Sequence, residues 1–358
     1  PNPTIGVEIE LQLIDDNTLD LKNISSKVLA DIDKKFCNRM KYELFESMIE
    51  INTDICSTIE EVEGDIKQTL RHLEEVLKNY NASINCSSLH PFARGKNQII
   101  SNDSRYKRIM NDLQIIGTRF ITQGLHVHIG IDECEKVIKV NNALRIYLPL
   151  LLALSTSSPF YEGEDTGLYS YRTKIFESLP LAGMPDYLNN WDHFTNITEN
   201  LIKANVIRSV KDLWWEVRPH PGFGTVEVRV CDIPVNLIQI LALIALIQAL
   251  VVTIQNLDKY PDTHIQILES NKWQAVRYGL EGTFIDPLTL KQLPIKKAIE
   301  DLCNLIEPVM ISLGSAKYVR VIEEILIQGT GASQKRDIFK KSGKFEYMIK
   351  SMKERFYQ

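Results

Sequence analysis

The chain has 358 residues, of which 44% are hydrophobic and 24% are charged, so it is globular and can bury a large core. Its formal net charge of −5 gives no basic footprint, which argues against nucleic acid as a partner. Six scattered cysteines without a C-x-x-C pair favour reduced thiols over a disulfide framework, so we expect a cytoplasmic protein.

The first predicted element is a strand over TIGVEIELQLID, residues 4–15. Apolar side chains alternate along it, and Glu8 and Glu10 share the opposite face. KYELFESMIEINT, residues 41–53, alternates in its second half and carries Glu50 on its polar face. Both segments therefore predict strands with one apolar and one acidic face.

Four further segments have helical patterns. A capping box at Ser57 and Glu60 opens the first, and Gly124 is the predicted stop signal of the second. The fourth is long and apolar enough to span a membrane, but two glutamines interrupt it and no basic residues or aromatic belt flank it. We interpret it as a buried core helix, and the chain from Pro294 onward also looks helical. The four helices are predicted over residues 57–80, 105–123, 140–155 and 236–256.

Two other segments alternate strictly. GLHVHIGID places His126 and His128 opposite apolar residues, and GTVEVRVCD does the same with Glu227 and Arg229. No Gly-rich turn follows any strand, so dinucleotide-binding and Walker A motifs are excluded. We predict an antiparallel sheet whose apolar face is covered by helices, rather than parallel βαβ units. These strands are predicted over residues 124–132 and 224–232.

The polar faces of the four strands hold glutamate, histidine and arginine, and lysine is absent from them. Carboxylates at positions i and i+2 of a strand lie about 7 Å apart and repel by about 2.4 kcal/mol at an effective dielectric constant of 20. Several such pairs on one surface require a cation, and carboxylates with an imidazole suit Mg²⁺ or Mn²⁺. Such metals beside many carboxylates are typical of phosphate chemistry. The residues concerned are Glu8, Glu10, Glu46, Glu50, His126, His128, Glu227 and Arg229.

Each pair taken alone has a simpler explanation. Glu8 and Glu10 could lie on a solvated strand face. His126 and His128 could be a structural pair, since H-x-H on a strand lacks the H-E-x-x-H pattern of zinc proteases. Glu227 could form a cross-strand salt bridge. The recurrence across four strands favours a functional surface.

Arginines supply candidate anion-binding groups, because a forked guanidinium suits carboxylates and phosphates alike. Arg172 lies in a Gly- and Tyr-containing loop, Arg218 precedes a Pro-His-Pro turn, and Arg277 follows NKWQAV. GTGASQKR is interpreted as a Gly-rich turn whose Lys335 and Arg336 could close over phosphates. Each of these arginines could also be an ordinary surface residue.

Five motifs occur in order along the chain: GVEIE, GLHVHIGI, SSPFYEGEDTGLYSYRT, VRPHPGFGTVEVRVCD and NKWQAVRYGL. Together they resemble the carboxylate-amine ligase family, the bacterial glutamate–cysteine ligases of type 2. The resemblance implies one catalytic domain over residues 1–358 with an α+β, glutamine-synthetase-like fold, in which a curved antiparallel sheet forms a funnel flanked by helices. It also implies ATP-dependent amide formation through an acyl phosphate, with Mg²⁺ bridging carboxylates and phosphates.

Residue roles follow from the same resemblance and the motif positions. Glu43 is a weaker candidate, because its strand parity is wrong unless the strand is bulged. The implied metal ligands are Glu8, Glu10, Glu50, His126 and Glu227. The implied catalytic residues are Arg172, Arg229 and Glu50. The implied cofactor-binding residues are Arg218, Arg277, Arg336 and His128.

Two departures from the family pattern are visible. Ile9 stands where many relatives have a third acid. Of the two arginines in a G-A-D-R-Q-R pattern, the similar GASQKR segment keeps only Arg336 in register, which leaves the nucleotide contacts of that segment open.

The leading hypothesis is an ATP-dependent carboxylate-amine ligase acting on small molecules, with glutamate and cysteine as substrates by resemblance only. One alternative is a metal-dependent phosphohydrolase or phosphotransferase that uses the same carboxylates. Another is a protein that binds Mg-ATP or a metabolite without turnover. We expect no nucleic-acid or membrane partner, and the long apolar helices allow a homodimer.

Overall fold

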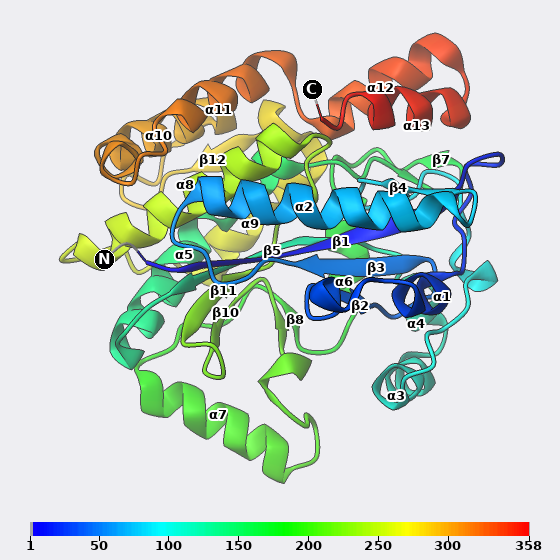
Figure 1. Ribbon diagram of the computed structural model, residues 1–358. Coiled ribbons are helices and arrows are strands. Elements are labelled where there is room, and N and C mark those ends of the chain that lie inside the picture. Colours follow the sequence, from blue (N-terminus) through cyan, green and yellow to red (C-terminus); the bar gives the residue numbers. More distant parts are fainter. Residues whose placement is uncertain (1–2, 358) are drawn as a thin grey trace.

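The computed structural model describes residues 3–357, and one layer of strands lies at its centre (Figure 1). The strands of this main sheet are β1 (Ile5–Asp15), β2 (Met40–Tyr42), β3 (Met48–Asn52), β4 (Ala82–Asn85), β5 (Leu125–Gly130), β10 (Val217–His220) and β11 (Thr225–Val228). They run in the order β10-β11-β5-β1-β3-β2, with β4 paired to the second half of β1. All of these pairings are antiparallel, as the sequence predicts.

Three long helices pack on the apolar face of the sheet (Figure 1). They are α2 (Ile59–Lys78), α5 (Cys134–Ser155) and α8 (Leu237–Asn256). Helices α5 and α8 are long and apolar enough to cross a membrane, but 89% of the relevant window of each is buried inside the protein. The predicted core helix is therefore confirmed, and the α+β class with it. Outside this layer lie α9 (Ile265–Tyr278), α10 (Ile295–Ser312), α11 (Lys317–Gln328), α12 (Gly331–Ser342) and α13 (Phe345–Glu354).

Shorter elements complete the description. The remaining helices are α1 (Ser25–Ala30), α3 (Ser104–Leu113), α4 (Ile115–Thr118), α6 (Tyr171–Glu177) and α7 (Trp191–Lys203). Small two-stranded sheets pair β6 (Phe160–Tyr161) with β7 (Glu164–Asp165), β8 (Ala182–Gly183) with β9 (Trp214–Trp215), and β12 (Thr283–Ile285) with β13 (Gln292–Pro294). One apolar core cluster includes residues from Ile5 to Phe356, so both ends of the described chain pack into it.

The first predicted helix is correct but its cap is shifted by one residue. Thr58 accepts a hydrogen bond from the backbone of Glu61, whose carboxylate accepts one from the backbone of Ser57. This arrangement is the capping box moved one position along the chain.

The predicted helix over residues 105–123 is wrong beyond α3. Gln114 has a φ of 50°, which ends α3, and only the short α4 follows before the chain enters β5. Gly124 is therefore not a helix stop, and it lies instead beside the first residue of β5.

The single strand predicted over residues 41–53 is also wrong, because the chain folds back between β2 and β3. In this turn Glu46 accepts hydrogen bonds from Ser26 N at 2.8 Å and Ser25 Oγ at 3.0 Å at the start of α1. A carboxylate there satisfies donors at a helix N-terminus. Glu46 thus leaves the polar face on which the alternation placed it.

Candidate active site

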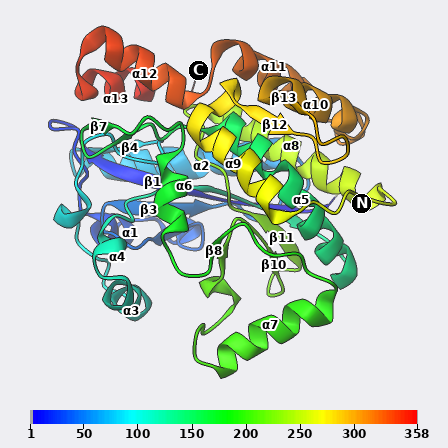
Figure 2. The same ribbon diagram turned by 180° about the vertical axis from the view of Figure 1, so that it is seen from behind.

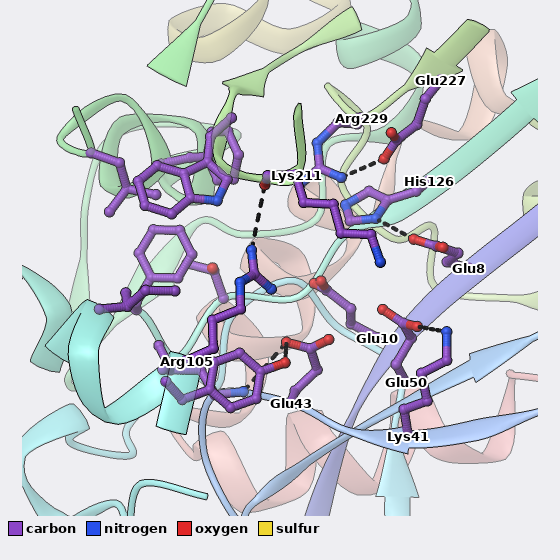
Figure 3. A pocket seen from close by; sticks show the side chains of 18 of the residues that line it. Glu8, Glu10, Lys41, Glu43, Glu50, Arg105, His126, Lys211, Glu227 and Arg229 are labelled. Atoms are coloured by element: carbon purple, nitrogen blue, oxygen red, sulfur yellow. Dashed lines mark hydrogen bonds and ion pairs between the residues drawn. The ribbon is translucent and has the colours of Figure 1, made fainter. Parts of the chain in front are cut away.

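The register of the sheet gathers acidic and imidazole side chains on its polar face. Directly opposed residues of antiparallel strands lie about 4.5–5.5 Å apart, so register alone brings their side chains together. A cavity of about 250 Å³ lies over this surface (Figure 3). The opposed pairs are Glu8–His126, Glu10–Glu50 and His128–Glu227.

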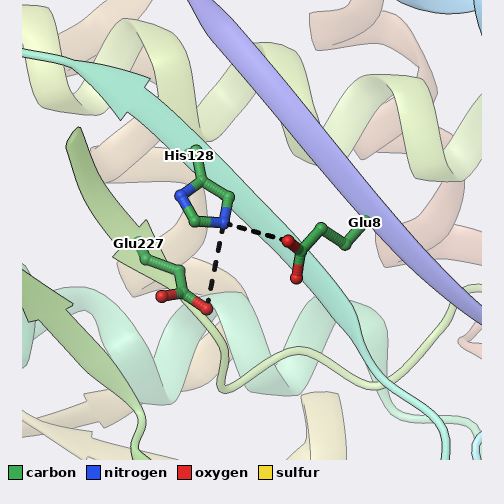
Figure 4. Close-up of side chains that lie close together, drawn as sticks. All are labelled: Glu8, His128 and Glu227. Atoms are coloured by element: carbon green, nitrogen blue, oxygen red, sulfur yellow. Dashed lines mark ion pairs between the residues drawn. The ribbon is translucent and has the colours of Figure 1, made fainter. Parts of the chain in front are cut away.

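The first candidate metal group consists of Glu8, His128 and Glu227 (Figure 4). His128 Nε2 lies 3.6 Å from Glu8 Oε1 and 3.9 Å from Glu227 Oε1. This nitrogen is buried and makes no hydrogen bond within residues 3–357, whereas Nδ1 lies 3.0 Å from the hydroxyl of Thr225. A neutral ring that donates Nδ1–H to this hydroxyl leaves the Nε2 lone pair for a metal ion.

Both carboxylates of this group favour the ionised form. Burial tends to raise the pKa of Glu8, but the neighbouring imidazoles of His126 and His128 bring it well below its usual value. Burial acts in the same direction on Glu227, and the guanidinium groups of Arg229 and Arg218 overcome it and lower that pKa. Arg218 Nε donates to Glu227 Oε2 at 2.7 Å, and Arg229 Nη1 donates to Oε1. The group is anionic before any cation binds.

His126 lies beside Glu8 in the lining of the cavity, and the ligand role that the sequence predicts for it stays a prediction. Its Nδ1 lies 3.2 Å from Glu8 Oε2, and in the described chain it belongs to neither group of closely spaced ligand atoms. Burial, followed by the charge of Arg229, lowers the pKa of His126 to about 4, so the ring is neutral at physiological pH. The geometry places His128 among the ligand atoms and His126 beside them.

The second candidate metal group consists of Glu10, Glu43 and Glu50, whose carboxylate oxygens lie within 4.8 Å of one another. Burial, reinforced by neighbouring carboxylates, raises the pKa of Glu10 to about 7 and also raises the pKa of Glu43 and of Glu50. Lys41 Nζ lies 3.5 Å from Glu50, and Tyr106 Oη donates to Glu43 at 3.4 Å. The charges of Lys41, Arg172 and Arg229 do not bring these carboxylates back to their usual pKa, so the donor set suits a divalent cation.

Two arginines reach the same cavity from different elements. Arg229 follows β11 and pairs with Glu227. Arg172 lies in the first turn of α6, and its Nη1 and Nη2 donate at 3.3 Å to the carbonyl oxygens of Val230 and Arg229. A Cβ added at Gly124 would collide with the guanidinium of Arg172. Glycine at this position therefore allows the arginine to pack against the start of β5.

Opposite the acids, the cavity has an apolar wall. Arg105 stands between the two sides, where its Nη2 donates to Asp212 at 3.2 Å and to the carbonyl of Lys211 at 3.4 Å (Figure 3). The cavity can thus hold phosphates and cations on one side and an organic group on the other. The wall consists of Ile109, Leu113, Phe120, Phe176, Leu179 and Trp214.

Comparison with known proteins assigns the chain to a family. Residues 4–354 match the family model of the glutamate–cysteine ligase family 2(GCS2). The chain belongs to this family. An inferred glutamate–cysteine ligase 2 from Gloeobacter violaceus is 39% identical over 351 residues, which cover 95% of this chain and 93% of the relative. One from Solibacter usitatus is 36% identical over 361 residues, which cover 98% and 93%.

A solved structure shares the fold. The glutamate–cysteine ligase of Francisella tularensis, in complex with AMP, superposes with a TM-score of 0.78 at 14% identity, over 99% of this chain and 88% of that one. The chain is therefore an ATP-dependent ligase, as the sequence predicts.

In the present structure the guanidinium N–H groups of Arg218 already donate hydrogen bonds within the protein. It borders the cavity, but it donates to Glu227 and to the carbonyl oxygens of Val210 and Leu213 at 3.0 and 2.7 Å. A buried arginine in this position orients Glu227 and holds the segment before β9 against the sheet. The contacts do not support the predicted nucleotide contact.

Arg277 and Arg336 lie outside the lining of the cavity. Arg277 Nη1 donates to the carbonyl of Gly167 at 2.7 Å, and Arg336 pairs with Asp165 at 2.6 Å. The predicted Gly-rich turn is wrong, because GASQKR forms the first turns of α12 after Thr330. A helix presents its side chains on all sides, so Arg336 faces the β6–β7 hairpin instead of the cavity.

Sequence reasoning undervalued two residues of the cavity. Glu43 lies in the turn between β2 and β3, where strand parity does not apply. Lys41 lies opposite Glu50 on β2, so the acidic face does contain one lysine. The sequence does contain a signal for both, because Lys41 and Glu43 are charged residues close to Glu50 in the chain. The strand alternation predicted over residues 41–53 hides this signal, since it runs across the turn between β2 and β3.

Proposed function

We propose that this ligase activates a carboxylate with ATP and joins it to an amine, with glutamate as the acid and cysteine as the amine. A carboxylate oxygen attacks the γ-phosphorus, the bond to the β–γ bridging oxygen breaks, and ADP leaves. The amine nitrogen attacks the acyl carbon of the acyl phosphate, inorganic phosphate leaves, and the nitrogen loses a proton. The products are an amide, ADP and phosphate.

One observation supports this proposal above the others: two acidic ligand groups stand side by side in a cavity that two arginines also reach. A non-catalytic sheet face would not need six buried or half-buried acids and imidazoles at this spacing. Mg²⁺ held by these groups would supply positive charge against the phosphates of ATP, and Mn²⁺ has similar ligand preferences. The groups are Glu8–His128–Glu227 and Glu10–Glu43–Glu50.

The arginines have a separate role. Arg172 and Arg229 carry a permanent charge and cannot ligate a metal, so they hold anionic oxygens while charge moves from ATP to the acyl phosphate. Glu50 serves in the second acidic group, and His126 keeps Glu8 in place through its 3.2 Å contact. The apolar wall accommodates the organic part of a substrate.

The test is ADP release with a panel of amino acids and amines, each added singly and then in pairs. Dependence on one acid and one amine together would support the ligase. ADP release that ignores every amine would indicate the phosphohydrolase or phosphotransferase. Binding of Mg-ATP without ADP release under any condition would indicate a non-catalytic binding protein. The Arg277→Ala variant, altered outside the cavity, should match the unaltered protein throughout.

We also propose that residues 1–358 act as one catalytic domain in the cytoplasm, where the six free thiols would stay reduced. The absence of nucleic-acid and membrane partners stays a prediction. The homodimer also stays a prediction, and the apolar helices α5 and α8 do not support it because they are buried within the protomer. Light scattering of the purified protein would decide the oligomeric state.

A further inference from the structure

Asp232 lies behind the active site, just past β11, and is fully buried. Its carboxylate accepts hydrogen bonds from Ser157 N at 2.9 Å, from Ser158 Oγ at 2.7 Å and from Ser170 Oγ at 2.9 Å. The first two donors follow α5, and Ser170 is the N-cap residue of α6. One carboxylate therefore ties together two segments that are far apart in the sequence.

Arg172 is placed by this cluster. Its Nη1 lies 3.9 Å from Asp232 Oδ1, and its backbone N–H donates to Ser158 Oγ at 3.2 Å. Its guanidinium lines the cavity and its charge is balanced from behind by the buried carboxylate. Movement of this carboxylate or of the serine loop would therefore move Arg172.

Helix α12, the last but one in the described chain, reaches the same loop, which contains Ser157 and Ser158. Lys335 is only 4% exposed, and its Nζ donates to the carbonyl of Ser157 at 2.6 Å and to Ser87 Oγ. Thr330, at the start of the helix, shares a 2.7 Å hydrogen bond with Thr156. Figure 2 shows α12 and α13 lying together over β4 and the β6–β7 hairpin.

The burial of Lys335 requires an explanation. In the described chain the hydrogen bonds of its Nζ go to Ser87 and Ser157 and not to a carboxylate, and the charge of Asp232 attracts it only from further away. A buried ammonium without a paired carboxylate costs stability, and a methionine of similar length would avoid that cost. The position of Lys335 next to the serine loop supplies a functional reason.

We propose that Lys335 and Asp232 are positioning residues of the ligase. Lys335 holds the loop of Ser157 and Ser158, Asp232 accepts the hydrogen bonds of that loop, and together they aim Arg172 into the cavity. In this assignment α12 supports the active site from behind instead of closing over a nucleotide. The inference rests on the proposed function in so far as Arg172 acts on phosphate oxygens.

The first experiment compares Lys335→Met with Lys340→Met, which alters an exposed lysine on the same helix. The probe is inorganic phosphate, titrated by calorimetry into protein with Mg²⁺ and ADP. We expect Lys335→Met to weaken phosphate binding, and to lower kcat for ADP release, by roughly 10- to 100-fold, as misplacement of a catalytic group by about 1 Å does. Lys340→Met should leave both unchanged. Equal affinities in the two variants would overturn the proposal.

The second experiment separates positioning from general stability with a double-mutant cycle. In an Arg172→Ala background, neither Lys335→Met nor Asp232→Asn should reduce phosphate affinity further. Losses that multiply with Arg172→Ala would mean that these residues act on the fold alone and would overturn the proposal. Ser158→Ala, a milder change in the same cluster, replaces Lys335→Met if that variant does not fold.

These measurements distinguish the two levels of inference. If no acid and amine pair releases ADP, the proposed ligase reaction fails, while the phosphate titrations still decide whether Lys335 and Asp232 position Arg172. If a pair releases ADP but Lys335→Met behaves like Lys340→Met, only the positioning role fails.

Discussion

Glu10 lies directly opposite Glu50 across the β1–β3 pair, and Glu43 from the adjacent turn completes a group of three carboxylates with raised pKa values. The backbone N–H of Gly124 donates to Glu10 at 2.6 Å, and Lys41 reaches Glu50, but these contacts do not offset the whole charge. The metal-free protein therefore holds this group under electrostatic strain that a proton or a cation relieves.

Replacing Glu10 should stabilise the metal-free protein in a pH-dependent way. In the folded protein the pKa of Glu10 is raised to about 7, whereas in the unfolded chain it keeps the ordinary value for glutamate. At pH 8 the folded protein must bury the charged form, which opposes folding. At pH 5.5 the folded protein holds Glu10 mostly protonated, so the cost is smaller. Glu10→Gln should raise Tm by a few degrees at pH 8 and by much less at pH 5.5, measured by calorimetry with a chelator present. Glu164→Gln, on an exposed strand, is the control. A lower Tm at pH 8 would show that Glu10 is structural.

The two histidines should differ in their effect on metal binding. His128→Ala removes a ligand atom and should abolish Mn²⁺ binding to the Glu8 group, measured by calorimetry. His126→Ala removes the partner that orients Glu8 and should weaken binding by roughly 10- to 100-fold. The reverse order of effects would return His126 to the ligand role that the sequence predicts.

A substitution at Gly124 tests the position of Arg172, because the guanidinium packs against the backbone of this glycine. Gly124→Ala places a methyl group against the guanidinium and should lower kcat for ADP release by roughly 10²-fold, because Arg172 must move. The same methyl group would lie 3.1 Å from His126 Nε2, so metal affinity is measured alongside kcat. Gly64→Ala is the matched control, since its Cβ meets open space within α2 and should raise stability by about 0.5–1 kcal/mol. Full activity in Gly124→Ala would contradict the assigned place of Arg172.

Arg229→Lys keeps the charge but loses the forked donor. We expect kcat to fall by ~10²–10³, comparable to the loss of one oxyanion donor, with little change in the Mg²⁺ dependence. Steady-state kinetics over a Mg²⁺ titration would measure both, with Arg277→Lys as the unaffected control. A variant that mainly shifted the Mg²⁺ midpoint would assign Arg229 to the support of Glu227 instead.

Much of the fold could be predicted from local patterns. The apolar helix over residues 236–256 is close to its predicted bounds because its apolar run is continuous, and β1 and β5 are close to theirs because their alternation is uninterrupted. β11 is shorter than predicted, since it ends at Val228 and the alternation continues beyond the sheet pairing to residue 232. The prediction was wrong where the chain changes direction within a periodic segment, at Gln114 and between β2 and β3. Hydrophobic periodicity along the sequence cannot detect a turn when the residues of the turn continue the same apolar and polar pattern.

The sequence by itself determined which side chains share the polar face, because alternation along a strand is a local property. Glu8, Glu10 and Glu227 follow from it directly. Only the tertiary structure decided how these side chains group. His126 and His128 share one face, and the register of β5 against β1 and β11 places His128 between Glu8 and Glu227. The register of the strands and the burial of Lys335, which lies on α12, depend on contacts with residues far away in the chain, and no local pattern contains them.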